Sequence, residues 1–245
     1  MTQFHNQTAI VTGGGYGIGR AVCQTLASSG WNIVVCDRDA QRASETTALI
    51  RASNGHAIEA IGDVVDPATA DGAVAIARET FGNVKGLVTC AVMRHAGRIT
   101  DITSDQWDET IKVVLYGVFH FCKAVVPEMI AAGGGSIVNV SSPDSFGRRG
   151  MTAYAAAKAA VNTLTTCLAA DYLPAGIRAN TVLSAFALTG MTEHYPAERL
   201  KEIASLSVAG RPGIPQDTAA LIGFLMSKEA EVFSGGVFGG FPMAR

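Results

Sequence analysis

Thr12-Gly-Gly-Gly-Tyr-Gly-Ile-Gly19 is the stretch that decides the fold of this 245-residue chain. It follows a short apolar run that begins at Thr8, and it leads into residues 18–29, which have helical periodicity. Glycine lets the backbone turn tightly and approach a bound phosphate, whose charge is attracted by the free N–H groups and the dipole of a helix N-terminus. A turn that serves packing alone is the less favoured interpretation. This context predicts a dinucleotide site, with backbone contacts from Gly13, Tyr16, Gly17, Ile18 and Gly19.

Short apolar runs alternate with longer helical stretches along the rest of the chain. Such alternation predicts a parallel sheet with right-handed crossovers and helices on both faces. We expect one α/β domain over residues 1–245, a Rossmann-type doubly wound sheet of about seven strands. The clearest strands are expected at residues 8–12, 32–36, 56–61, 86–90, 136–140 and 178–183, and helices at 18–29, 40–53, 67–81, 104–132 and 152–175.

Composition excludes several classes of partner. The formal charge of −2 provides no basic surface for nucleic acid, and no stretch approaches the roughly 20 apolar residues of a membrane helix. The five cysteines are odd in number and never spaced as CxxC, so we expect no disulfide framework, no metal site and a reducing, cytoplasmic environment. No signal-peptide pattern precedes the glycine turn.

Asp37 ends the second expected strand, where dinucleotide-binding folds place an acidic residue on the adenosine ribose. A carboxylate there repels the additional phosphate of NADP, so we favour NAD(H). Arg38 keeps NADP open, because arginine can accommodate that phosphate. After the third strand, Asp63 and Val64 are expected to give the adenine one polar and one apolar contact. Asp63 has an equally plausible role as a cap of the helix near Pro67.

Tyr154 and Lys158 are four residues apart on an expected helix, so both side chains lie on one face. A lysine ammonium roughly 4 Å away contributes on the order of 4 kcal/mol, which lowers the pKa of a tyrosine by about 3 units. Hydride transfer to or from a nicotinamide requires such an acid/base group at the substrate oxygen. The pair therefore indicates proton transfer coupled to hydride transfer, although this spacing also occurs by chance.

Together with the glycine turn and the strand end Asn139-Val-Ser-Ser142, this pair resembles the short-chain dehydrogenase/reductase family over nearly the whole chain. The resemblance implies that Tyr154 is the acid/base and that Lys158 lowers its pKa and holds the ribose. It also implies that a serine hydrogen-bonds the substrate oxygen. We choose Ser142, the family's usual position, and keep Ser141 as the alternative because its spacing to Tyr154 is the usual one.

Further features of the resemblance bear on the cofactor. Thr89-Cys-Ala-Val92 replaces the family's Asn-Asn-Ala-Gly and keeps only Ala91 as a cofactor contact, while Thr189 is retained against the nicotinamide carboxamide. Val114 replaces an asparagine that holds a water on the proton path to the lysine. We expect an NAD(H)-dependent oxidoreductase that interconverts a secondary alcohol and a ketone. The departures keep a second hypothesis open, an NAD(H)-binding sensor or structural subunit with little catalysis.

Residues 184–215 form the least regular region, and we expect them to cover the substrate at the carboxyl edge of the sheet. The side chains expected to flank a cyclic or aromatic ketone are Met93, His95, Phe146, Met151, Phe186, Met191, His194 and Tyr195. Arg148 and Arg149 suit a carboxylate clamp, but a solvated pair is the preferred interpretation. The resemblance implies a homotetramer, assembled through the helices at 104–132 and 152–175.

Overall fold

Seven parallel strands form the sheet of this protein. The computed structural model describes residues 7–184, 195–205 and 207–239. The strands are β1 (Gln7–Thr12), β2 (Trp31–Asp37), β3 (Ala57–Ile61), β4 (Val84–Thr89), β5 (Gly135–Ser141), β6 (Ile177–Leu183) and β7 (Val237–Gly239). They are ordered β3-β2-β1-β4-β5-β6-β7, and every neighbouring pair is parallel. The expected doubly wound α/β fold is confirmed.

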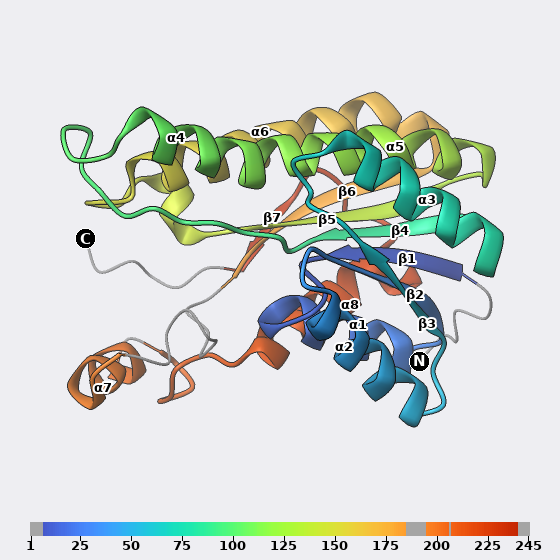
Figure 1. Ribbon diagram of the computed structural model, residues 1–245, viewed down its shortest axis with the longest axis horizontal. Helices are drawn as coiled ribbons and strands as arrows, with labels where there is room; N and C mark the ends of the chain where they lie inside the picture. Colours follow the sequence, from blue (N-terminus) through green and yellow to red (C-terminus); the bar gives the residue numbers. More distant parts are fainter. Residues whose placement is uncertain (1–6, 185–194, 206, 240–245) are drawn as a thin grey trace.

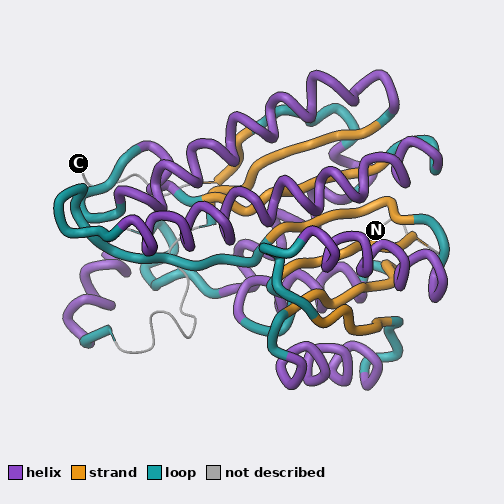
Figure 2. Tube along the Cα trace, turned by 45° about the horizontal axis from the view of Figure 1, so that its top comes forward, coloured by secondary structure: helices purple, strands orange, loops and turns teal. Residues whose placement is uncertain are grey.

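Helices cover both faces of the sheet (Figures 1 and 2). One face carries α3 (Pro67–Phe81), α4 (Ser104–Ile111), α5 (Gly117–Ala131) and α6 (Thr152–Tyr172). The other carries α1 (Gly17–Ser28), α2 (Ala40–Ala52) and α8 (Pro215–Met226). From β3 the chain returns to the far side of β1 as β4, and doubly wound folds bind ligands at such a change of direction, beside the carboxyl ends of β1 and β4.

Side-chain caps explain where several helices begin. Asp39 accepts the Arg42 N–H at 3.1 Å and caps α2. Asp66 accepts the Ala68 N–H at 2.9 Å and caps α3, so the alternative that Asp63 caps this helix is wrong. These caps satisfy backbone donors that a helix start leaves without partners. Sequence had indicated both starts to within a residue.

The single helix expected at residues 104–132 is interrupted. α4 ends at Ile111, a π-helical stretch covers Lys112–Tyr116, and α5 continues to Ala131. The π-helical stretch contains Val114, which is fully buried, and it lies against α6. Hydrophobic periodicity does not reveal one extra residue in a turn, so the sequence predicted a continuous α-helix.

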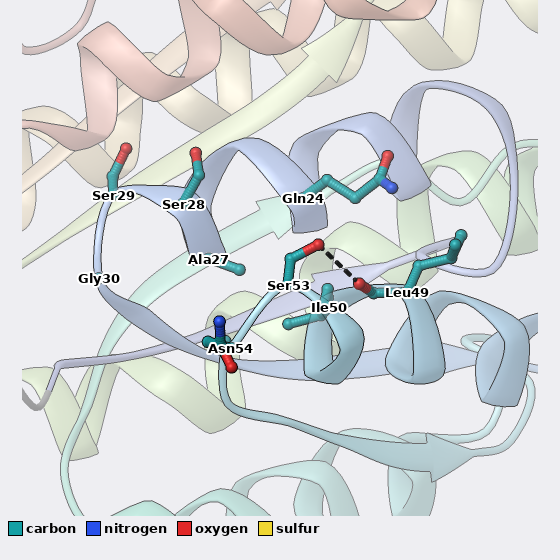
Figure 3. Close-up of a pocket in the computed structure, with 10 residues that line it drawn as sticks. Gln24, Ala27, Ser28, Ser29, Gly30, Leu49, Ile50, Ser53 and Asn54 are labelled. Atoms are coloured by element: carbon teal, nitrogen blue, oxygen red, sulfur yellow. Dashed lines mark hydrogen bonds between the residues drawn. The ribbon is translucent and has the colours of Figure 1, made fainter.

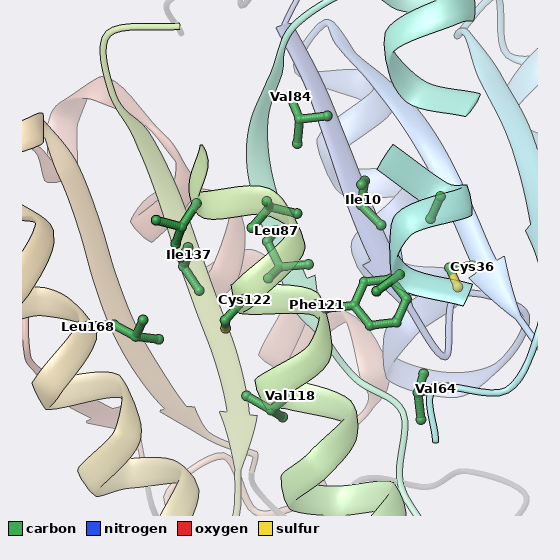
Figure 4. Packing of buried hydrophobic residues seen from close by; sticks show 14 of the residues in the cluster. Ile10, Cys36, Val64, Val84, Leu87, Val118, Phe121, Cys122, Ile137 and Leu168 are labelled. Atoms are coloured by element: carbon green, nitrogen blue, oxygen red, sulfur yellow. The ribbon is translucent and has the colours of Figure 1, made fainter. Parts of the chain in front are cut away.

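Alternate residues of each buried strand supply two hydrophobic clusters, one under each helical layer. On the α3–α6 side, Ile10 and Leu87 pack with Phe121 of α5 (Figure 4). On the other side, Val11 and Ile33 pack with residues of α1 and α8. Burying a side chain such as Phe121 stabilises the fold by about 2 to 3 kcal/mol. The central strands are therefore held from both faces.

One segment is more apolar than we expected. Residues 104–131 form a stretch of 28 residues that is long and apolar enough, by composition, to cross a membrane, so the expectation that no stretch qualifies is wrong. The inner face of α5 packs on β4, β5 and α3. A helix buried in a protein core can have the same length and apolar composition, and the packing of α5 accounts for its composition.

Candidate active site

The glycine turn between β1 and α1 is built around two close backbone approaches. Gly13 has a φ of +63°, and a Cβ placed on it would lie 2.8 Å from the Ala91 nitrogen. A Cβ on Gly19 would overlap the carbonyl oxygen of Gly13. No other residue fits at either position without a backbone shift. The two glycines therefore let the turn pack closely against itself and against Ala91 at the carboxyl end of β1.

The start of α1 resembles an anion-binding site. Tyr16 occupies the N-cap position, no side-chain hydrogen bond caps the helix, and its first turn contains no acidic residue. The Tyr16 ring lies between two arginines, with the guanidinium carbons of Arg20 and Arg42 at 5.6 and 5.0 Å from its centroid. The N–H groups of Gly17, Ile18 and Gly19 thus belong to a helix end that attracts negative charge.

Asp37 lies beside this turn. Its carboxylate accepts the Gly15 N–H at 2.9 Å and the Asp39 N–H at 3.1 Å. Arg38 extends away and approaches the carboxylate of Asp63 at 3.9 Å. Asp37 therefore fixes the shape of the glycine turn in addition to the ribose contact that we expect of it.

Val64 is oriented toward the core. Its side chain packs under α5, where a Cβ on Gly117 would lie 2.8 Å from it, and its carbonyl oxygen meets Nδ1 of His120 at 3.2 Å. We expected the Val64 side chain to contact the adenine, but it packs against α5 instead. Ala91, by contrast, lies against the turn, with its N–H 3.3 Å from the Thr12 hydroxyl oxygen.

A buried amide joins the strands to the helix that carries the tyrosine. Asn139 on β5 accepts the Thr89 hydroxyl at 2.8 Å and donates to the Thr165 hydroxyl oxygen on α6 at 2.9 Å. All three side chains are buried, and each bond satisfies a polar group that would be costly to leave alone. This network sets α6 against the carboxyl ends of β4 and β5.

The two candidate serines have different surroundings. The Ser141 hydroxyl is fully buried and donates to the carbonyl oxygen of Lys158 at 3.2 Å. Ser142 interacts by a side-chain hydrogen bond with Tyr154, and its hydroxyl oxygen also accepts the Asp144 N–H at 3.1 Å. The structure thus brings Ser142, and not Ser141, to the tyrosine.

Burial dominates the acidity of Tyr154, which is 8% exposed. Desolvation raises the pKa of its phenol to about 12, the hydrogen bond from Ser142 lowers it, the negative charge of Asp144 raises it, and Arg94 lowers it. Our expectation that the tyrosine titrates near neutrality is therefore wrong for this structure. The phenol holds its proton throughout the neutral range.

The surroundings of Lys158 explain why the pKa of Tyr154 is not lowered toward neutrality. Its ammonium donates to the carbonyl oxygen of Val140 at 2.5 Å and lies 5.8 Å from the Tyr154 ring centroid. Burial in turn lowers the pKa of the lysine to about 8. From the sequence we expected a nearby lysine ammonium to lower the pKa of the tyrosine. In the structure that ammonium is desolvated and bound to a backbone carbonyl.

Sequence reasoning missed two charged residues beside the tyrosine, Arg94 and Asp144. Both act on the pKa of Tyr154 through their charge. Asp144 pairs with Arg148 at 3.3 Å, and the Arg148 side chain remains exposed, as we expected of a solvated charge. The sequence could have indicated Arg94, because it lies between Met93 and His95, which we expected to flank the substrate. His95 itself pairs with Glu109 of α4 at 2.7 Å.

Part of the expected substrate cover lies outside the described residues, including Thr189, Phe186, Met191 and His194. Of residues 184–215, the structure describes α7 (Ala197–Ser205), which lies beyond the carboxyl end of β6 (Figure 1). This position agrees with a segment at the carboxyl edge of the sheet. Phe146, another pocket candidate, is 71% exposed.

A separate hollow of about 450 Å³ lies between the C-terminal ends of α1 and α2 (Figure 3). Its wall includes Ser28, Ser53 and Asn54, and the Ser53 hydroxyl donates to the carbonyl oxygen of Leu49 at 3.1 Å. These loops lead into β2 and β3, so the hollow lies at the amino edge of the sheet, opposite the tyrosine. It does not belong to the candidate active site.

A model of the short chain dehydrogenase family matches residues 7–200. The chain belongs to this family. It is 33% identical to 2,5-dichloro-2,5-cyclohexadiene-1,4-diol dehydrogenase LinX of Sphingobium indicum, over 94% of this chain and 92% of that protein. It is 31% identical to cyclohexanol dehydrogenase of an Acinetobacter species, over 95% and 92% of the two chains.

Solved structures agree with this assignment. The crystal structure of gox2181 superposes with a TM-score of 0.91 at 30% identity and covers 96% of this chain and 94% of its own. A short-chain type dehydrogenase/reductase from Mycobacterium ulcerans gives a TM-score of 0.89 at 26% identity, with 96% and 88% covered. The sequence resemblance to the family is therefore confirmed, and the chain is an oxidoreductase of the short-chain dehydrogenase type.

Gly19→Ala tests the close approach in the glycine turn. The new Cβ would displace the Gly13 carbonyl, so we expect NADH affinity to fall at least tenfold and the melting temperature to drop. Gly72→Ala is the matched control, since Gly72 lies within α3 with no atom within 4 Å of its added Cβ. That control should stabilise the protein by about 1 kcal/mol and leave NADH affinity unchanged. Equal NADH affinity in both variants would contradict the proposed role of the turn.

Lys158→Met tests the cost of the buried ammonium. Folding lowers the pKa of Lys158 from 10.5 to about 8, so between these values the unfolded chain binds more protons and wild-type stability rises with pH. Relative to the variant, wild type should gain about 2 kcal/mol between pH 8 and pH 10. Urea unfolding of both proteins at the two pH values measures this gain. A pH-independent difference would show that the lysine is not desolvated.

Proposed function

We propose that the protein is an NAD(H)-dependent oxidoreductase that interconverts a secondary alcohol and a ketone, with Tyr154 as the acid/base. The observation that carries this proposal is the surroundings of the Tyr154 hydroxyl. It interacts with Ser142 at the end of β5, and the tyrosine lies on the same helix face as Lys158. A group that holds a proton next to a dinucleotide site suits hydride transfer at a carbonyl carbon.

The residues of the turn fit a dinucleotide. The tight glycine turn and the start of α1, which no side chain caps, suit a pyrophosphate. Asp37 has an acceptor carboxylate at the position of the adenosine ribose. The bound nicotinamide would supply or accept the hydride, and Lys158 would hold the nicotinamide ribose as the family resemblance implies.

The protein's own residues would handle the proton. In reduction, the phenol of Tyr154 donates its proton to the substrate oxygen, and Ser142 donates a hydrogen bond to the same oxygen. In oxidation the tyrosine must first lose that proton, which its raised pKa opposes. We therefore expect alcohol oxidation to accelerate as the pH rises toward 10.

Two relatives support the alcohol class. LinX and the Acinetobacter enzyme are named for a cyclohexadiene diol and for cyclohexanol, both of which bear hydroxyl groups on a six-membered ring. A cyclic secondary alcohol or its ketone also suits Met93 and Met151, two of the apolar side chains that the sequence suggests for the substrate pocket. The cofactor-binding sensor is the second candidate, favoured by the replacement of a family asparagine by the buried Val114.

Tyr154→Phe separates these two functions. It removes the proton donor and leaves the glycine turn intact, so we expect loss of NADH-dependent ketone reduction with NADH affinity within a few fold of wild type. Steady-state turnover of cyclohexanone and NADH fluorescence titration measure the two effects. Unchanged turnover in this variant would exclude Tyr154 as the acid/base. A wild-type protein that binds NADH tightly and reduces no ketone would support the sensor.

Asp37→Ser tests the cofactor preference. We expect wild type to use NADH more efficiently than NADPH, because the carboxylate repels the additional phosphate. The variant should narrow that ratio by about tenfold, with Arg38 and Arg42 available to bind the phosphate. Because Asp37 also holds the Gly15 N–H, NADH affinity should fall as well. Equal kcat/KM for both cofactors in wild type would refute the assignment of NAD(H).

Assembly as a homotetramer and a cytoplasmic location are part of the same proposal. The outer surface of α5 and the turn before it expose Tyr116, Phe119 and Ile130, each about half exposed in the single chain. Apolar side chains gathered on one helix support a subunit interface there. This is the helix that the family resemblance implicates in assembly.

A further inference from the structure

The segment from Ala91 to Gly97 runs from the cofactor turn to the start of α6. At one end the Ala91 N–H lies 3.3 Å from the Thr12 hydroxyl oxygen. At the other end, Gly97 donates to the Gly150 carbonyl at 2.8 Å, and its own carbonyl accepts the Thr152 hydroxyl at 3.1 Å. Tyr154 follows two residues later. The segment is therefore fixed at the glycine turn by one end and at the start of α6 by the other.

Arg94 lies in that middle portion, half-buried, and within the part of the chain that the structure describes it makes no hydrogen bond or ion pair. Its neighbours differ: His95 is held by Glu109 at 2.7 Å, and Arg98 by Asp101 at 2.6 Å. Partly burying a guanidinium without a partner is costly, because the charge loses water and gains no acceptor. A guanidinium without a protein partner can form charge-assisted hydrogen bonds with the carboxylate or phosphate of a ligand.

The other charged groups around the tyrosine already have hydrogen-bond or ion-pair partners. Asp144 is paired with Arg148 at 3.3 Å, and the ammonium of Lys158 is bound by the Val140 carbonyl. Arg94 acts on Tyr154 through its charge, in the direction that lowers the tyrosine pKa, which agrees with a position close to the hydroxyl. Among the described residues, Arg94 is thus the charged group near the tyrosine that has neither a carboxylate nor a carbonyl partner, whereas Arg148 has the first and Lys158 the second.

We propose that Arg94 is a specificity residue that binds a carboxylate of the substrate, so that the protein acts on anionic alcohols and ketones in preference to neutral ones. This inference rests on the proposed function, because it names the substrate class of the same site. A guanidinium can bind a carboxylate through two parallel N–H···O bonds, which fixes orientation as well as affinity. Arg94 would thereby orient the ketone carbon relative to Tyr154.

A matched pair of ketones tests the proposal. The acids 3- and 4-oxocyclohexanecarboxylate differ from their carboxamides in charge and hardly in size. With NADH, we expect the KM of wild type to be at least tenfold lower for one acid than for its amide, as a charge-assisted bidentate pair implies. Arg94→Met should abolish that preference by raising the KM of the acid alone. Arg94→Lys should restore part of it.

Arg98→Met is the control, since it removes the same charge from the same loop at an exposed, already paired position. It should leave the acid preference intact; an equal loss in both variants would indicate a general field and overturn the proposal. The proposal would also be overturned if wild type had the same KM for each amide as for the corresponding acid. Melting temperatures check that each variant is folded.

Calorimetric titration of the acids into the protein with NADH separates this inference from the proposed function. Tight binding that Arg94→Met weakens, without turnover of any ketone, would support Arg94 as the carboxylate site and refute the catalytic proposal. Turnover of neutral ketones with no preference for the acids would support the catalytic proposal and refute Arg94 as the carboxylate site. Absence of both acid binding and acid preference would overturn the role of Arg94.

Discussion

The contact between Gly13 and the backbone of Ala91 is the constraint on which the site depends. Because Gly13 has no side chain, the segment leaving β4 passes the end of β1 at a distance that a Cβ would not allow. That segment then crosses to Gly97, which is bonded to the start of α6. One close approach thus relates the cofactor turn, Arg94 and the tyrosine helix to each other.

Desolvation outweighs charge attraction in the pair formed by Tyr154 and Lys158, for which we propose a catalytic role. At an effective dielectric near 20, an ammonium roughly 4 Å from a phenolate contributes on the order of 4 kcal/mol, but here both groups are buried and the lysine is bound to Val140. Burial therefore raises the pKa of Tyr154 and lowers that of Lys158. Each shift disfavours the charged form, so the fold bears a cost in stability at the residues that the reaction needs.

Local patterns predicted the features that local physics controls. The strand–turn–helix around Gly13, the shared face of Tyr154 and Lys158, and the doubly wound sheet follow from periodicity and turn chemistry. Three features required the folded chain. The π-helical turn at Val114 changes no periodicity. The choice of Ser142 over Ser141 depends on which hydroxyl reaches Tyr154, and the pairing of Asp144 with Arg148 depends on a loop conformation.

A tyrosine with a raised pKa remains a competent acid in one direction. Hydride addition to a ketone produces an alkoxide, which is a far stronger base than a phenolate, so Tyr154 can protonate it even with a pKa of about 12. Neutralising Arg94 with a bound carboxylate would remove a charge that lowers this pKa, and the phenol would hold its proton more firmly until the alkoxide forms. Oxidation gains nothing from this arrangement, because it must begin from the phenolate. In the proposed reaction, burial of Tyr154 would therefore slow oxidation of the alcohol at neutral pH while leaving the tyrosine able to protonate the alkoxide formed in reduction.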